Sequence, residues 1–160
     1  MVCVAAVTAV PGPNTLQLQR GSLCESTEKI VFSCAIAEAP KIVSLCSSKE
    51  LTKDRGYLQY RFGLPGKVEL EYPKQRDHTQ SAFKYSHYFR AQVDDTEISF
   101  TTGGHEYVVF DIYNGEQKRV IHNQGVRVTL PTTPKPAMFS CREKPTAHYE
   151  DLPEAFPEPE

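Results

Sequence analysis

Three of the five cysteines in this chain of 160 residues lie close together, between Cys24 and Cys46. The stretch contains two short apolar runs, residues 29–35 and 41–46, separated by five residues that end in Pro40. Two apolar runs of strand length with so short a connection predict a β-hairpin. The cysteines then tie the ends of this hairpin to the rest of the molecule, which restricts the chain to folds built around it.

The register of the hairpin decides which cysteines can pair. A five-residue loop pairs Ala35 with Lys41 and sets Cys34 opposite Ile42. Cys46 then lies on the same face as Cys34, four residue positions further along. That separation is about 13 Å, which is beyond the reach of a disulfide bond.

The simplest connectivity therefore joins Cys24 to Cys46 and Cys34 to Cys141. The second bond closes a loop of more than a hundred residues, and the chain-entropy model assigns it about 4–5 kcal/mol. Two disulfides indicate an oxidising compartment. The alternative is that these four cysteines are reduced, buried thiols in a cytosolic protein.

A second hairpin is predicted around the Leu-Pro-Gly sequence at 64–66, between two alternating runs. Placing the apolar side chains of both runs on one face requires Phe62 opposite Val68, and Gly66 allows the loop to turn. The same register sets Arg61 opposite Glu69 on the outer face, a cross-strand pair that contributes roughly 0.2–1 kcal/mol.

Asn114-Gly115 lies between two alternating runs and is the strongest local turn signal of the chain. It predicts a two-residue type I′ turn that pairs Tyr113 with Glu116. One face of the hairpin would then carry Tyr107, Val109, Asp111, Tyr113, Lys118, Val120 and His122. If this face met only water its apolar content would be unusual, since exposed apolar patches mark contact surfaces. The alternative is that both faces of this sheet are buried.

Short alternating runs recur along the whole chain, and no segment predicts a convincing helix. The expected strands are residues 15–19, 29–35, 41–46, 57–63, 67–73, 82–90, 97–101, 106–113, 116–122 and 126–130. The pattern predicts an all-β fold, an antiparallel meander of about nine or ten short strands that forms a barrel or a sandwich.

The chain length suits one domain with two flanking segments. Residues 1–22 are an N-terminal segment, read either as a signal-like remnant followed by a first strand or as ordinary strand. Residues 23–141 form a single β-domain. Residues 142–160 are rich in proline and acids, carry a net charge of −4, and are expected to be a disordered tail. No apolar run approaches the roughly 20 residues that span a bilayer.

At VFSC, KIVSLC, GYLQYRFGLPGKVELEYP and SHYFRAQVDDTEISF the sequence resembles an uncharacterised group of small proteobacterial β proteins. The resemblance covers roughly residues 22–130. Members of that group carry a secretion signal, so the resemblance implies a periplasmic or secreted location. It implies no activity, and no functional residue is transferred from it.

No pattern in the sequence identifies a catalytic residue, a metal site or a cofactor. There is no G-x-S-x-G, H-E-x-x-H or P-loop sequence, and the five histidines lack ligand spacing. Asp94 and Asp95 are expected in a hairpin loop. Aspartate is a common turn residue, so a turn is more frequent there than a calcium site. The candidate binding residues are Tyr88, Arg90, Tyr107, Asp111, Tyr113, Lys118 and His122.

We expect a non-enzymatic, extracytoplasmic domain that binds another macromolecule, with a protein as partner. One specific version, which rests on fold analogy alone, is an inhibitor or immunity-type protein that blocks a cell-wall hydrolase. The overall charge of −2 gives no general attraction to nucleic acid. Two alternatives come from other classes: a small-ligand carrier with an apolar cavity in a barrel, and a hydrolase that uses His87 or His105 in an unrecognised site.

Overall fold

The computed structural model of the chain describes residues 18–133 and 135–157. Within them the chain forms two five-stranded antiparallel sheets, with the strand orders β10-β1-β2-β3-β4 and β5-β6-β7-β8-β9. The strands are β1 (Lys29–Ala35), β2 (Ile42–Ser47), β3 (Leu58–Leu64), β4 (Lys67–Tyr72), β5 (Lys84–Arg90), β6 (Val93–Thr102), β7 (His105–Asn114), β8 (Ile121–Thr129), β9 (Ala137–Ser140) and β10 (Thr146–Ala147). A 3-10 turn, Gln80–Ala82, precedes β5, and a short helix, α1 (Leu152–Ala155), follows β10. The all-β prediction is confirmed, and of its two forms the sandwich is the one observed. Most of the expected strand 15–19 lies outside the described residues.

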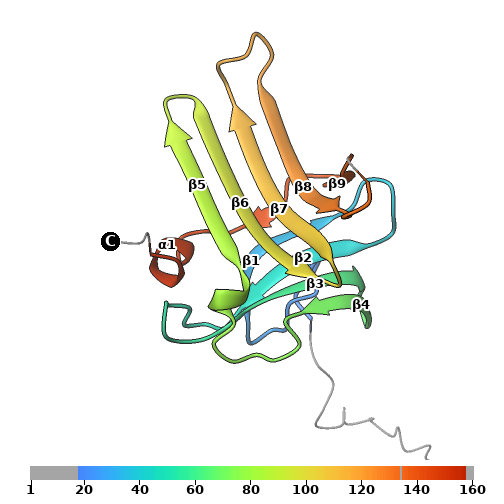
Figure 1. Cartoon of the computed structure of the whole chain (residues 1–160), viewed down its shortest axis with the longest axis vertical. Coiled ribbons are helices and arrows are strands. Elements are labelled where there is room, and N and C mark those ends of the chain that lie inside the picture. The colour runs from blue at the N-terminus through green and yellow to red at the C-terminus, as the bar shows by residue number, and fades with distance from the viewer. Residues whose placement is uncertain (1–17, 134, 158–160) are drawn as a thin grey trace, which may run out of the picture.

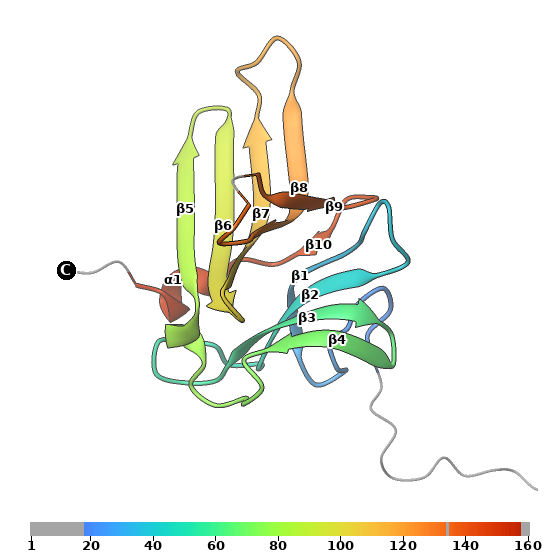
Figure 2. The ribbon, with the colours of Figure 1, turned by 45° about the vertical axis from the view of Figure 1, so that its right-hand side comes forward.

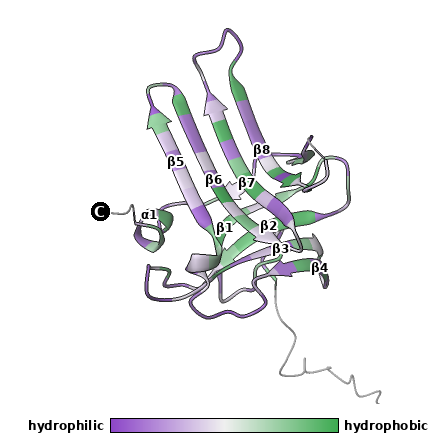
Figure 3. Cartoon of the chain, viewed as in Figure 1, coloured by the Kyte–Doolittle hydropathy of each residue, from purple (hydrophilic) through white to green (hydrophobic). Residues whose placement is uncertain are grey.

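The second sheet crosses the first and extends well beyond it (Figure 1 and Figure 2). β6 and β7 have ten residues each and β8 has nine, whereas β1 to β4 have six or seven. One half of β5–β8 therefore packs on the first sheet, and the other half stands free of it. We call this free half the protruding half. Figure 3 shows hydrophobic and hydrophilic residues interspersed along it.

Aromatic rings fill the space between the sheets where they cross. Phe100 of β6 stacks on Tyr107 of β7, with a centroid distance of 4.9 Å, and on Tyr72 of β4 at 4.8 Å. Tyr60 and Phe83 contact the same ring at 4.9 and 5.5 Å. Because aromatic side chains bury more apolar area than other residues, this cluster is the main contact between the two sheets.

The first hairpin has the expected strands but a different register. Ala35 pairs with Ile42 instead of Lys41, and a β-bulge lies between Ile30 and Phe32. Six residues, 36–41, therefore separate the paired strands instead of five, and the Ile36 N–H donates to the Lys41 carbonyl across this loop at 2.9 Å. The bulge absorbs the difference, because an extra residue in one strand restores the pairing beyond it.

Both predicted disulfides are formed, Cys24–Cys46 and Cys34–Cys141, with Cα–Cα distances of 5.4 and 5.6 Å. The reason differs from the one expected. Cys34 pairs with Val43, three residues before Cys46, and side chains an odd number of positions apart point to opposite faces of a sheet. The sheet itself therefore separates Cys34 from Cys46.

The second hairpin is also shifted from its predicted register. Arg61 pairs with Glu71, two residues further along than expected, and Phe62 is not opposite Val68. A bulge lies between Phe62 and Gly63. A Cβ at Gly63 would come within 2.6 Å of the backbone of the neighbouring strand, so only glycine fits this bulge.

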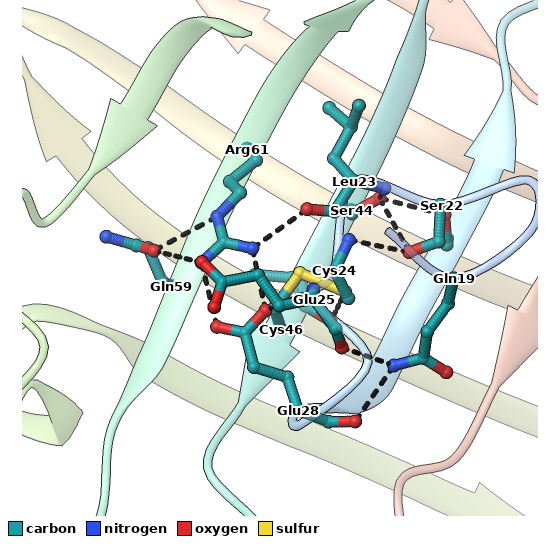
Figure 4. The surroundings of a disulfide bond; sticks show 12 residues. Gln19, Ser22, Leu23, Cys24, Glu25, Glu28, Ser44, Cys46, Gln59 and Arg61 are labelled. Atoms are coloured by element: carbon teal, nitrogen blue, oxygen red, sulfur yellow. Dashed lines mark hydrogen bonds and ion pairs between the residues drawn. A yellow bond between two sulfur atoms is a disulfide. The ribbon is translucent and has the colours of Figure 1, made fainter. Parts of the chain in front are cut away.

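Arg61 lies on the outer face of its hairpin, as predicted, but it is buried there, with 2% of its area exposed. The segment 18–28 covers it, and Figure 4 shows the guanidinium enclosed beneath that segment next to the Cys24–Cys46 disulfide. All five of its N–H groups donate hydrogen bonds: to Gln59 Oε1 twice, to the Leu23 carbonyl, and to both carboxylate oxygens of Glu28. A buried charge is tolerated when it is paired and fully hydrogen-bonded in this way.

Glu28 is the partner that neutralises Arg61, at 2.7 and 2.8 Å. Its carboxylate also accepts hydrogen bonds from the Tyr57 hydroxyl at 2.8 Å and the Glu25 N–H at 2.6 Å. Burial by itself would raise the pKa of Glu28, but these hydrogen bonds outweigh burial and hold the pKa below its ordinary value. Burial and the contact with Glu28 raise the pKa of Tyr57 to about 12.

The predicted Asn-Gly turn is wrong. Tyr113 pairs with His122, so the β7–β8 connection is the loop 115–120 and not a two-residue turn. β8 begins at Ile121, inside the expected strand 116–122, and runs on through 126–129. This register sets Val126 opposite Val109 in the core, and burial of these side chains outweighs the local turn preference.

Residues 142–157 differ from the expected disordered tail. The chain leaves the second sheet after β9, and the Arg142 N–H donates to the Ala35 carbonyl at the end of β1, at 2.8 Å. β10 then joins the edge of the first sheet. α1 places Leu152 and Ala155 in the hydrophobic core. Burial of these apolar side chains outweighs the proline and acid content around them.

Asp94 and Asp95 also differ from expectation, because they lie within β6 and not in a loop.

We predict that Glu28→Gln lowers the free energy of unfolding at neutral pH by roughly 3–5 kcal/mol, because it removes the carboxylate closest to the buried Arg61 charge, while Glu71 and Glu25 lie farther away, at 3.4 and 4.0 Å. The pKa of Glu28 is lowered in the folded protein, so its contribution is present above the pKa of the unfolded chain, about 4.3, and is lost as the pH falls through the lowered folded value. Urea unfolding of both proteins at several pH values measures this. Glu50→Gln is the control, since Glu50 forms an exposed pair with Arg55 at 3.8 Å. Equal losses for the two variants would contradict the prediction.

We predict that the double variant Cys34→Ser/Cys141→Ser is less stable than wild type by about 4–5 kcal/mol in the chain-entropy model. The reason is the long loop, since the two cysteines are 107 residues apart. The Cys24–Cys46 bond closes a loop of only 22 residues, so the same model gives a smaller loss of stability for Cys24→Ser/Cys46→Ser. Denaturant unfolding under non-reducing conditions compares them. A larger loss for the second double variant would contradict the loop-entropy account.

Candidate functional site

The inner face of the protruding half carries two rows of polar and aromatic side chains. Cross-strand partners form the row nearest the tips, Phe89, Asp94, Tyr113 and His122, and the next row, His87, Thr96, Asp111 and Gln124. The third row, Tyr85, Ile98, Val109 and Val126, already packs against the core. The change from apolar to polar side chains therefore coincides with the point where the second sheet leaves the first.

A pocket of about 290 Å³ lies on these two rows, next to Tyr149 from the segment between β10 and α1. We call it the Asp–Tyr pocket; its lining residues are Asp94, Thr96, Asp111, Tyr113, His122 and Tyr149. Asp111 accepts three hydrogen bonds, from His122 Nε2 at 2.8 Å, from Gln124 Nε2 at 2.9 Å and from the Tyr149 hydroxyl at 3.0 Å. These three hydrogen bonds hold the Asp111 carboxylate in position.

His87 and Asp94 form a second histidine–carboxylate pair on the same face, with His87 Nε2 2.9 Å from Asp94 Oδ1. Burial and the negative charges of Asp111 and Asp94 raise the pKa of Tyr149 well above its ordinary value. Burial and Asp94 also raise the pKa of Tyr85. Both shifts have a common cause, because two carboxylates on one sheet face make this part of the surface negative.

The two hairpin tips of the protruding half are held together. Arg90 of β5 forms a two-point ion pair with Glu116 of the loop 115–120. The Gly115 N–H donates to the Gln92 carbonyl at 2.7 Å, across the two tips. A backbone hydrogen bond and a two-point Arg–carboxylate pair restrict relative motion of the tips, so they form one surface.

Exposed apolar side chains gather at these tips. Six large hydrophobic side chains of the described residues are exposed, and four of them, Tyr88, Phe89, Val120 and Ile121, lie at or next to the tips. Phe89 is the most exposed, at 71%. The loop between β7 and β8 adds Lys118 and Arg119, which are exposed and form no ion pair with any described residue. Such a mixture of aromatic and cationic side chains is typical of protein contact surfaces.

The structure brings together only some of the predicted binding residues. Asp111, Tyr113 and His122 line the Asp–Tyr pocket. Tyr88 and Arg90 lie on the opposite face of β5 near the tip, and Lys118 lies in the loop 115–120. Tyr107 is in the core and stacks on Phe100.

Sequence reasoning missed Phe89, Asp94, Thr96 and Tyr149. Phe89 lies in the expected strand 82–90, but the alternation of side chains does not show where one sheet extends beyond the other. Asp94 and Thr96 fell in a region read as a turn. Tyr149 belongs to the segment expected to be disordered, and only its position beside the apolar residues of α1 could have indicated that it was ordered.

Acid–base chemistry at the histidines lacks a nucleophile among the described residues. No serine, threonine or cysteine side chain there hydrogen-bonds to His87 or His122, and His105 Nδ1 contacts only the Gly103 carbonyl of its own turn. Cys24, Glu28 and Cys46 bring three potential metal ligands within reach of one another. The two sulfur atoms are bonded to each other, and metal binding needs the thiolate form.

Comparison of this chain with protein-family models, with curated proteins and with solved structures gives no significant match. The resemblance to small secreted proteobacterial proteins stays a prediction. Among the described residues no helix has the length and apolar character needed to cross a membrane.

We predict that Tyr149 stays protonated at pH values where an ordinary tyrosine, with a pKa of about 10, has ionised. The nearby Asp111 and Asp94 carboxylates and burial raise its pKa. Tyrosinate absorbance during an alkaline titration measures this: Tyr149→Phe should leave the amplitude below about pH 11 unchanged. A loss of one tyrosine's amplitude in that range would show that Tyr149 ionises normally and is not beside both carboxylates.

Proposed function

We propose that the protein is a non-enzymatic, extracytoplasmic binding domain that recognises another protein with the tips of the protruding half. The observation that carries the proposal is the concentration of exposed apolar side chains there, four of the six in the described residues. Aromatic side chains that are already fixed in place make favourable contact residues, because they lose little conformational entropy on binding.

The rigidity of the tips supports the same function. The Arg90–Glu116 pair and the hydrogen bond from Gly115 to Gln92 join the two hairpins before any partner binds. The core and the first sheet hold the other end of the same strands. A preorganised projection of this kind suits insertion into a cleft, because its conformational entropy is already lost on folding and not on binding.

The two disulfides of the described residues support a location outside the reducing cytosol. We infer a periplasmic or secreted protein. The partner is therefore sought among extracytoplasmic proteins.

A cell-wall hydrolase is the partner class that the charges at the tips favour. Lys118 and Arg119 are exposed in the loop 115–120 and precede the exposed Val120. Glycan-cleaving enzymes generally hold a pair of carboxylates in their clefts, and exposed cations flanked by apolar side chains complement such a cleft. We propose that the tips enter the substrate cleft and inhibit the enzyme.

The other two functions have less support. A carrier would need an apolar cavity, but aromatic rings fill the space between the sheets at their crossing. A hydrolase would need a nucleophile or a positioned water beside His87 or His122. The histidine–carboxylate pairs alone favour hydrogen bonding to a ligand as much as catalysis.

We predict that the protein binds and inhibits at least one member of a panel of purified bacterial peptidoglycan hydrolases. Phe89→Ser and Lys118→Glu should each lower the affinity roughly tenfold or more, as expected for contact residues at the centre of an interface. Biosensor binding and residual hydrolase activity measure this.

Two matched substitutions distinguish the tips from the rest of the surface. Val68→Ser removes an exposed apolar side chain of β4, and Lys74→Glu reverses an exposed charge far from the tips. Both should bind like wild type. An absence of binding across the panel would refute the hydrolase partner, and a partner that is insensitive to both tip substitutions would refute the proposed surface.

A further inference from the structure

The Asp–Tyr pocket holds two carboxylates that are paired with histidines and not with a lysine or arginine of the described residues. Asp111 accepts hydrogen bonds from His122, Gln124 and Tyr149, and Asp94 from His87. No lysine or arginine of the described residues lies within ion-pair distance of either carboxylate. The pocket therefore presents two carboxylates without a lysine or arginine partner among the described residues.

Thr96 is a second and independent feature that favours a ligand site. Its side chain lines the pocket between the two aspartates, and only 5% of the residue is exposed. Its hydroxyl forms no hydrogen bond with any described residue, so it can bond to a ligand in the pocket. A ligand with an N–H or O–H donor would complete this site.

The arrangement of acceptors defines what kind of ligand fits. A primary ammonium group has three N–H donors and no acceptor. Asp94, Asp111 and the Thr96 hydroxyl supply three acceptors on adjacent strands. Tyr113 and Tyr149 supply aromatic walls, which suit both a cation and the alkyl chain attached to it.

We propose that the Asp–Tyr pocket binds a primary ammonium group on a short alkyl chain, carried either by a small amine or by a lysine side chain. The pocket lies next to the tips, since Asp94 pairs with Phe89, but its lining contains none of the exposed apolar tip residues, so the inference does not depend on the proposed recognition of a hydrolase. The volume of about 290 Å³ accommodates one such group with its chain.

Titration of the full-length protein with butylamine, followed by amide NMR, tests the site directly. Saturable shifts are expected at Thr96, Asp111 and Tyr149, and increasing salt should weaken them. Nα-acetyl-lysine amide is the second arm. Binding of both ligands supports a site that also takes a lysine side chain, whereas binding of butylamine alone assigns it to small amines. Butanol and tetramethylammonium are controls, because one lacks the charge and the other lacks N–H donors.

Two substitutions separate binding from folding. Thr96→Val and Asp94→Asn should each weaken butylamine binding roughly tenfold or more, the effect of removing one hydrogen bond to a charged group. Asp77→Asn, on an exposed loop, should bind like wild type. The amide spectra show whether each variant keeps the fold. The proposal is overturned if butylamine causes no saturable shift at these residues, if tetramethylammonium binds equally well, or if folded Thr96→Val and Asp94→Asn proteins retain full affinity.

Discussion

The two sheets of the sandwich have strands of unequal length, and both the candidate surfaces result from this difference. A strand of ten residues in an antiparallel sheet is about 34 Å long, compared with roughly 20–24 Å for six or seven residues. β6 and β7 therefore cannot be covered along their whole length by β1–β4. The covered half forms the core around Phe100, and the uncovered half presents its side chains to solvent.

The covered half is also the best-anchored part of the molecule. On the outer side of the first sheet, Arg61 and Glu28 hold the segment 18–28 in place, together with the Cys24–Cys46 disulfide. At the corner where the chain crosses between sheets, Cys34 is bonded to Cys141. A projection can be rigid only if its base is fixed, so these buried interactions support the geometry of the tips.

Features that depend on residues close together in the sequence could be predicted, whereas features that depend on contacts between distant segments could not. The hairpins around Pro40 and Pro65 were identified because alternation and turn residues are local signals. Their registers were wrong by one or two residues, because bulges at Ile30–Phe32 and at Gly63 depend on packing against other strands. The Asn114-Gly115 signal failed for the same reason. Of the Asp–Tyr pocket, Asp111, Tyr113 and His122 were anticipated, while Thr96 and Tyr149 come from other segments.

The sequence by itself determined that the chain is all-β and that Cys24 pairs with Cys46 and Cys34 with Cys141. The all-β class follows from local periodicity. The disulfide pairing was predicted from the short reach of a disulfide bond, whereas in the structure Cys34 and Cys46 are kept apart because they lie on opposite faces of the sheet. Only the tertiary structure decided which faces are buried, that Arg61 lies inside, and that Asp94, Thr96, Asp111 and Tyr149 meet in one pocket. These depend on how far one sheet extends past the other and on where the C-terminal segment docks, and neither is encoded in the pattern of a single strand.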